Sequence, residues 1–122
     1  MQDTRTERQI QQALFDRCNG LEGNADPRLK KLHPVENAKG AGSGPAGYEY
    51  ASGSPDCFLP FPIAPFHGAY IELKRQGRKP TAKQIAKHKE LREDGYAVEW
   101  FDNEHDAFDF LVQYLAGDYP PF

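Results

Sequence analysis

Two short apolar runs in the middle of the chain, residues 57–61 and 69–73, constrain its fold more than any other feature. Both are rich in aromatic, aliphatic and β-branched residues, and only PIAPFHG, with two prolines and a glycine, separates them. This pattern predicts two β-strands joined by a short connection. Because an isolated strand pair is unstable in water, the rest of the chain must supply elements that cover it.

Three other segments have the apolar spacing of amphipathic helices: residues 4–17, about 82–94 and 104–116. Thr81 is a good N-cap for the second helix, and Gly95 lies where a helix commonly ends. The apolar positions of that second helix are Ile85, Ala86 and Leu91.

The remaining segments read as strands and loops. Residues 96–101 have strand composition, and residues 29–36 could be a strand that Pro34 restricts to a sheet edge or a bulge. Residues 39–55, rich in Gly and Ser, predict a flexible or ligand-covering loop. The order α-β-β-β-α-β-α predicts an α/β fold, a mixed β-sheet flanked by helices.

Length and composition exclude several classes of protein. With 122 residues and 12% aromatic residues, the chain should form one packed domain, residues 1–122. Two cysteines, Cys18 and Cys57, are too few for a disulfide-rich scaffold, and we expect both to be buried thiols. No apolar run approaches the roughly 20 residues of a membrane span, and the first residues lack a signal sequence. We expect a soluble, cytoplasmic protein.

Charge is unevenly distributed although the whole chain carries only −3. Residues 74–92 contain eight Lys or Arg and one acid, a net +7, whereas residues 93–122 contain eight acids and no Lys or Arg. A basic segment of this kind favours an anionic partner such as DNA. A solvated helix face is the alternative. The candidate DNA-binding residues are Arg75, Arg78, Lys79, Lys83, Gln84 and Lys87.

Asp56, Glu72 and Lys74 form the candidate catalytic group. Side chains alternate across a strand, so Glu72 and Lys74 share one face, and Asp56 reaches the same face if the two strands pair. Two carboxylates are suitable ligands for Mg²⁺, and an adjacent ammonium can balance charge on a phosphate. An ordinary ion pair between Glu72 and Lys74 is the alternative.

Pro55-Asp56 followed by Glu72-Leu73-Lys74 resembles the motif of the PD-(D/E)XK nucleases. The surrounding residues resemble one subfamily, the VRR-NUC domains, which have a Gly-x-Pro-Asp stretch, Ile-Glu-Leu-Lys, a Gly turn, a helical Gln and a Gly-Tyr-x-Val strand. The counterparts in this chain are Gly53–Asp56, Ile71–Lys74, Gly77, Gln84 and Gly95–Val98.

The resemblance implies a restriction-endonuclease-like fold and metal-dependent cleavage of DNA. It implies that Mg²⁺, which Mn²⁺ can replace, binds Glu7, Asp56, Glu72 and the Leu73 backbone carbonyl, while Lys74 assists catalysis. Stand-alone chains of this type look viral or bacterial, so we expect a bacterial or phage-infected cell as the location.

Small nucleases of this fold that act on branched DNA generally work as homodimers, because a four-way junction needs two matched incisions. We therefore expect a homodimeric Holliday-junction resolvase. The alternatives are a less selective nickase or flap nuclease, and a catalytically silent DNA-binding module. Candidate interface residues are Phe58, Phe61, Phe66 and Tyr70, or the tail Tyr119-Pro120-Pro121-Phe122.

Overall fold

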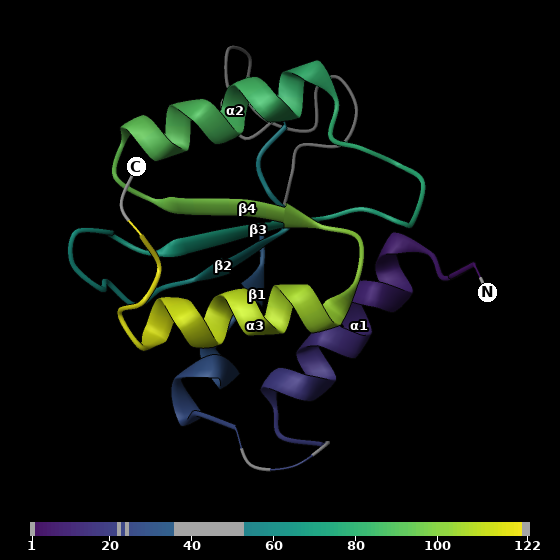
Figure 1. Cartoon of the computed structure of the whole chain (residues 1–122), viewed down its shortest axis with the longest axis horizontal. Helices are drawn as coiled ribbons and strands as arrows, with labels where there is room; N and C mark the ends of the chain where they lie inside the picture. The colour runs from purple at the N-terminus through teal and green to yellow at the C-terminus, as the bar shows by residue number, and fades with distance from the viewer. Residues whose placement is uncertain (1, 22, 24, 36–52, 121–122) are drawn as a thin grey trace, which may run out of the picture.

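The computed structural model describes residues 2–21, 23, 25–35 and 53–120. It confirms the predicted order of helices and strands and adds one short 3-10 helix, η1 (Figure 1). Most of the predicted loop 39–55 lies outside the described residues. The elements are α1 (Glu7–Cys18), η1 (Pro27–Lys31), β1 (His33–Pro34), β2 (Cys57–Leu59), β3 (Ala69–Leu73), α2 (Ala82–Glu93), β4 (Ala97–Phe101) and α3 (Glu104–Leu115).

The described strands form one mixed sheet in the order β1-β2-β3-β4. The pairs β1–β2 and β2–β3 are antiparallel, and β3–β4 is parallel, with α2 as the connection between its strands. Cys57 lies opposite Ile71, and Glu72 lies opposite Trp100. The mixed α/β architecture predicted from the sequence is therefore confirmed.

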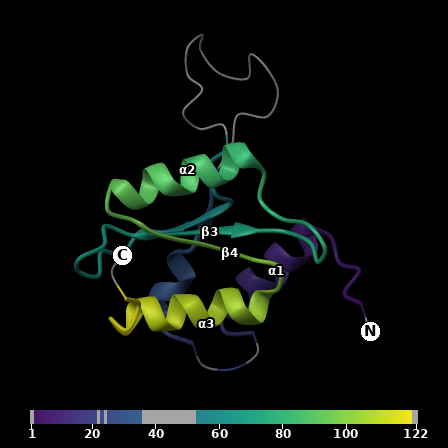
Figure 2. The ribbon, with the colours of Figure 1, turned by 45° about the horizontal axis from the view of Figure 1, so that its top comes forward.

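The two faces of the sheet differ in character. Helix α2 lies over one face, and α1 and α3 lie over the other (Figures 1 and 2). The hydrophobic core lies between the sheet and the α1–α3 layer, where α1 contributes Ile10 and Leu14 and α3 contributes five buried residues. Burial of these side chains is the main force that holds the fold together.

Helix α2 does not have the apolar face that its sequence predicts. Ile85 is 54% exposed, Ala86 is exposed and Leu91 is only half-buried, while the single buried residue of the helix is His88. The apolar positions Ile85 and Ala86 of this helix therefore do not pack against a core. The physical reason is that Glu72 of β3 and Lys74, which directly follows that strand, lie beneath α2, so α2 covers a polar surface.

Two predicted strands are shorter than expected. Residues 27–31 form η1, where Pro27 occupies the first position and the Asp26 side chain accepts from the Arg28 amide. Among the described residues 29–35 of the predicted strand 29–36, the strand is therefore limited to His33–Pro34. Strand β2 ends at Leu59 rather than at residue 61. Pro60 and Pro62 lack the N–H that a continued strand would need.

The connection between β2 and β3 is fastened to α3. The Tyr114 hydroxyl donates to the Phe61 carbonyl at 2.6 Å and accepts from the Ile63 amide at 3.2 Å. Tyr114 is fully buried, and Phe66 packs near it with 6% exposure. This anchoring explains how a proline-rich connection holds a fixed path.

Several aromatic residues that are candidates for a dimer interface pack within this chain, which is the alternative that we expect for Phe58 and Tyr70. Phe66 belongs to the core, and Phe61 and Tyr119 pack against it. The rings of Phe58 and Tyr70 stand 4.4 Å apart on neighbouring strands. Residues 121–122 of the predicted tail lie outside the described residues.

Both cysteines, Cys18 and Cys57, are buried free thiols, as expected. Burial raises the pKa of the Cys18 thiol to about 12, so it is unreactive at neutral pH. Among the described residues, no helix combines the length and apolar character that crossing a membrane requires.

We expect Tyr114→Phe to lower the free energy of unfolding by about 1–3 kcal/mol, because it leaves the Phe61 carbonyl and the Ile63 amide without their buried partner. The control Ile85→Ala removes more carbon but from an exposed site, and should change stability by less than about 0.5 kcal/mol. Urea unfolding measures both. A larger loss for Ile85→Ala than for Tyr114→Phe would contradict the described role of α2.

Candidate active site

Strands β2 and β3 bring Asp56 and Glu72 together. Asp56 immediately precedes β2, and the register that pairs Cys57 with Ile71 continues to place Asp56 opposite Glu72. The Asp56 Oδ2 atom accepts a hydrogen bond from the Leu73 amide at 2.8 Å. Its own backbone carbonyl accepts from the Val35 amide at 2.7 Å. Backbone amides therefore hold both the side chain of Asp56, through Leu73, and its main chain, through Val35.

Glu72 and Lys74 share the α2 face of β3, as strand alternation predicts. Glu72 is 1% exposed and Lys74 is 8% exposed, whereas Leu73 between them lies in the core on the opposite face. The N–H and C=O of one strand residue point to the same side of the strand. Since the Leu73 amide binds Asp56, the Leu73 carbonyl also faces that side.

His88 contacts the same pair from α2. Its Nε2 atom lies 3.2 Å from Glu72 Oε1, and both side chains are buried. No motif in the sequence selects His88, because the four histidines have no metal-ligand spacing. Helical spacing was the available signal, since His88 lies four residues after Gln84 and three before Leu91, on one face of the helix.

The two carboxyl groups of the site are partly removed from water, and this desolvation raises the pKa of each. Burial, followed by the neighbouring Glu72 carboxyl, raises the pKa of Asp56 to about 7. Burial also raises the pKa of Glu72. The pKa of His88 is lowered by burial and by the nearby charges of Arg92 and Lys74, so its imidazole is neutral at pH 7.

The donor set fits a hard cation with few protein ligands. Mg²⁺ typically takes one or two carboxylates and keeps several waters, and Asp56 and Glu72 supply that number. Two mutually repelling carboxylates, one buried and one half-buried, gain most from a divalent charge between them. Among the described residues, no three His, Cys, Asp or Glu side chains form a complete metal-binding cluster.

Glu7, the third predicted carboxylate ligand, lies in the first turn of α1. Its charge raises the pKa of Glu72, which places the two groups within electrostatic range, but it does not complete a three-residue cluster. Thr6 caps the helix start and Gln9 closes the capping box.

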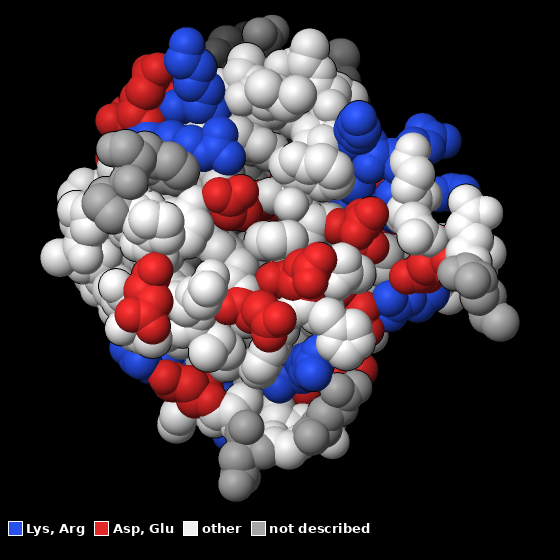
Figure 3. All heavy atoms as spheres, in the orientation of Figure 1, with Lys and Arg blue, Asp and Glu red and all other residues white. Residues whose placement is uncertain are grey.

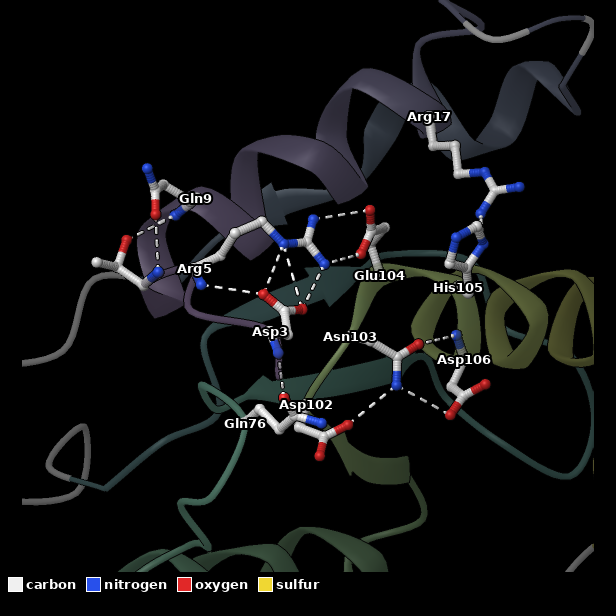
Figure 4. Close-up of polar contacts among 11 residues, drawn as sticks. Asp3, Arg5, Gln9, Arg17, Gln76, Asp102, Asn103, Glu104, His105 and Asp106 are labelled. Atoms are coloured by element: carbon white, nitrogen blue, oxygen red, sulfur yellow. Dashed lines mark hydrogen bonds and ion pairs between the residues drawn. The ribbon is translucent and has the colours of Figure 1, made fainter. Parts of the chain in front are cut away.

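A polar network fixes this end of α1. The Arg5 guanidinium binds Glu104 of α3 at 2.7 and 2.9 Å and Asp3 at 2.8 Å, and the Asp3 amide donates to Gln76 (Figure 4). Gln76 follows Lys74 in the loop after β3. The network therefore ties the residues before Glu7 to the strand that carries Glu72.

The remaining predicted residues surround α2. Gln84 already serves the helix N-terminus, since its Oε1 accepts from the Thr81 amide at 2.8 Å. Arg75, Arg78, Lys79 and Lys83 are exposed, and Lys87 forms an ion pair with Glu90 at 3.5 Å. Gly53, at φ +80, lets the segment before Asp56 pass close to Lys83, because a Cβ there would meet Lys83 Cγ at 3.3 Å. The contacts with DNA that the sequence predicts for these basic residues and for Gln84 stay predictions.

We expect the metal-free protein to lose stability as the pH rises from about 4 to about 7. The folded pKa of Asp56 is about 7 against an ordinary 3.8, so the unfolded chain loses this proton first and unfolding is favoured across that interval. In Asp56→Asn the decline should be smaller. Urea unfolding in chelator at several pH values measures it, with Asp109→Asn as an exposed control. An equal decline in Asp56→Asn and the wild type would contradict the raised pKa of Asp56.

Comparisons with known proteins agree with this geometry at the level of fold. No protein-family model matches the sequence, and no curated protein matches it. A solved structure described as a VRR_NUC domain protein superposes with a TM-score of 0.73 at 21% sequence identity. The match covers 93% of this chain and 90% of that one. The chain therefore has the fold of a VRR-NUC domain protein, as its sequence predicts.

Proposed function

We propose that this chain is a Mg²⁺-dependent, structure-specific endonuclease that hydrolyses DNA phosphodiester bonds. The observation that carries the proposal is half-buried Asp56 opposite buried Glu72, with Lys74 on the same face, in a VRR-NUC-like fold. An ordinary ion pair would need one carboxylate per ammonium. Two carboxylates with one Lys leave an excess of negative charge that a divalent cation can neutralise.

Asp56, Glu72 and the Leu73 carbonyl would hold the metal ion, with Glu7 acting at longer range. When bound, Mg²⁺ supplies positive charge for the phosphate and lowers the pKa of a coordinated water. The Leu73 amide keeps Asp56 in place, because it holds Oδ2 at 2.8 Å. Asp56 would bind the ion as the carboxylate and would therefore release the proton that its raised pKa otherwise retains.

Lys74 is suited to act on the charge that develops during hydrolysis. It is 8% exposed, and its side chain lies on the same face as Glu72. A partly desolvated ammonium interacts more strongly with a phosphate or an attacking hydroxide than an exposed one does. Lys74 would thus stabilise the transition state, while Asp56 and Glu72 bind the ion.

The basic segment 74–92 supports DNA as the substrate. It comprises the loop after β3 and helix α2, so its charge lies next to the site, whereas acids predominate over β4 and α3 (Figure 3). Separation of the two signs gives the molecule one face that attracts a polyanion. Phosphate contacts by exposed Lys and Arg would orient the strand toward Lys74.

We further propose that the substrate is a four-way junction and that two copies act together, because resolution requires two matched incisions. The second candidate is a less selective nickase or flap nuclease, because the exposed basic loop 75–79 could contact the phosphates of any DNA form. A catalytically silent DNA-binding module is the weakest alternative, since Asp56, Glu72 and Lys74 are all retained.

Asp56→Ala and Glu72→Ala should each reduce cleavage of a four-way junction about a thousandfold, because metal charge supplies several kcal/mol of transition-state stabilisation. Lys74→Ala should cost about 100-fold or more. Asp109→Ala, an exposed acid of α3, serves as the control. Gel assays in Mg²⁺ with junction, flap, nicked and linear duplex should show paired incisions in the junction. Cleavage by Asp56→Ala at the wild-type rate would refute the catalytic assignment.

The basic segment should also determine how binding depends on salt. Replacing Arg78 and Lys83 together with Ala should flatten the slope of log affinity against log salt by about 2 units, since each lost phosphate contact removes roughly 0.9. The double variant Lys30→Ala, Lys31→Ala removes the same charge from η1 and should leave the slope unchanged. Fluorescence anisotropy at several salt concentrations measures both. Equal slopes in all three proteins would make segment 74–92 only a solvated face.

A further inference from the structure

Helix α2 buries one side chain, and that side chain is a histidine. Its twelve residues include exposed Ile85 and three Lys, yet His88 is 2% exposed. An imidazole loses hydration when buried, and a hydrogen bond must offset that loss. A helix that needed only a packing contact at this point would bury an aliphatic residue. The choice of His88 therefore requires a polar reason.

The polar partner of His88 is the Glu72 carboxylate. His88 Nε2 stands 3.2 Å from Glu72 Oε1, with side-chain exposures of 3% and 1%. On its other side, Glu72 meets Asp56 across the β2–β3 pair. Glu72 is thus held between a helix and a neighbouring strand, with solvent excluded from the contact.

The direction of this hydrogen bond decides what the contact does. If Nε2 carries the hydrogen, it donates to Glu72 and leaves the carboxylate anionic and able to bind a cation. If Nε2 is bare, Glu72 must be protonated to donate, and one of its oxygens is lost as an ordinary metal ligand. Ligating carboxylates are commonly held by such outer hydrogen bonds.

We propose that His88 is a positioning residue whose Nε2–H holds Glu72 in the orientation that binds the divalent ion together with Asp56. This inference rests on the proposed function and extends it to a residue that contacts neither the ion nor the DNA. His88 acts only through Glu72. It also couples α2, the helix of the basic segment, to the metal-binding strand.

Matched variants separate positioning from packing. His88→Gln keeps an N–H donor at similar reach, while His88→Leu keeps bulk and removes the donor. His88→Leu should weaken binding of Mn²⁺ alone, measured by calorimetry, by about 10- to 100-fold, and should raise the Mg²⁺ concentration needed for half-maximal cleavage to match. His88→Gln should restore most of both. Thermal unfolding of each variant identifies any loss of fold.

A second measurement uses only the metal-free wild-type protein. Nitrogen-15 NMR of the imidazole should show His88 as the Nε2–H form with a hydrogen-bonded proton, and Glu72→Gln should shift that signal. The Nδ1–H form would overturn the proposal, even if His88→Leu fails to fold. Equal Mn²⁺ affinity of folded His88→Leu and wild type would overturn it as well. If the wild type itself binds no Mn²⁺ and cleaves no DNA, the proposed function falls, whereas the NMR result reports on the His88–Glu72 bond independently.

Discussion

The close approach of half-buried Asp56 to buried Glu72 is the interaction on which the rest of the structure depends. Two acids in a poorly hydrated site destabilise the fold when both are ionised, and the pKa of Asp56 rises to about 7 as a result. Specific partners stabilise the two carboxyl groups: the Leu73 amide donates to Asp56, His88 contacts Glu72, and Lys74 lies on the same face. Leu73 belongs to β3, Lys74 directly follows it, and His88 belongs to α2. The site therefore requires the antiparallel β2–β3 pair and helix α2.

This demand explains why the sheet has two unlike faces. The α1–α3 face carries the hydrophobic core, including fully buried Leu14 and Leu111, and that core supplies the stability. Helix α2 itself contributes little apolar burial, since Ile85 is exposed and His88 is its one buried residue. Because stability comes from one side, the other side can hold buried charge, which functional sites commonly do.

Much of this arrangement could be predicted from sequence, and the failures have physical causes. Strand alternation correctly placed Glu72 and Lys74 on one face, because that periodicity depends only on backbone geometry. Thr81 and Gly95 correctly marked the ends of α2, since caps are local. The apolar residues of α2 do not mark its buried face, because sequence periodicity cannot reveal that the surface beneath a helix is polar. His88 was missed for the same reason: its role depends on a partner sixteen residues away. The contacts of residues 36–52 lie outside the described part of the chain.

The central claim is that Asp56 and Glu72 form a divalent-cation site. A crystal grown with Mn²⁺ and measured at an energy where manganese scatters anomalously would locate the ion without reference to activity. We expect an anomalous peak between the two carboxylates, with oxygen ligands at about 2.2 Å and waters completing the coordination. An anomalous map with no peak at these carboxylates, at a Mn²⁺ concentration that supports DNA cleavage, would contradict it.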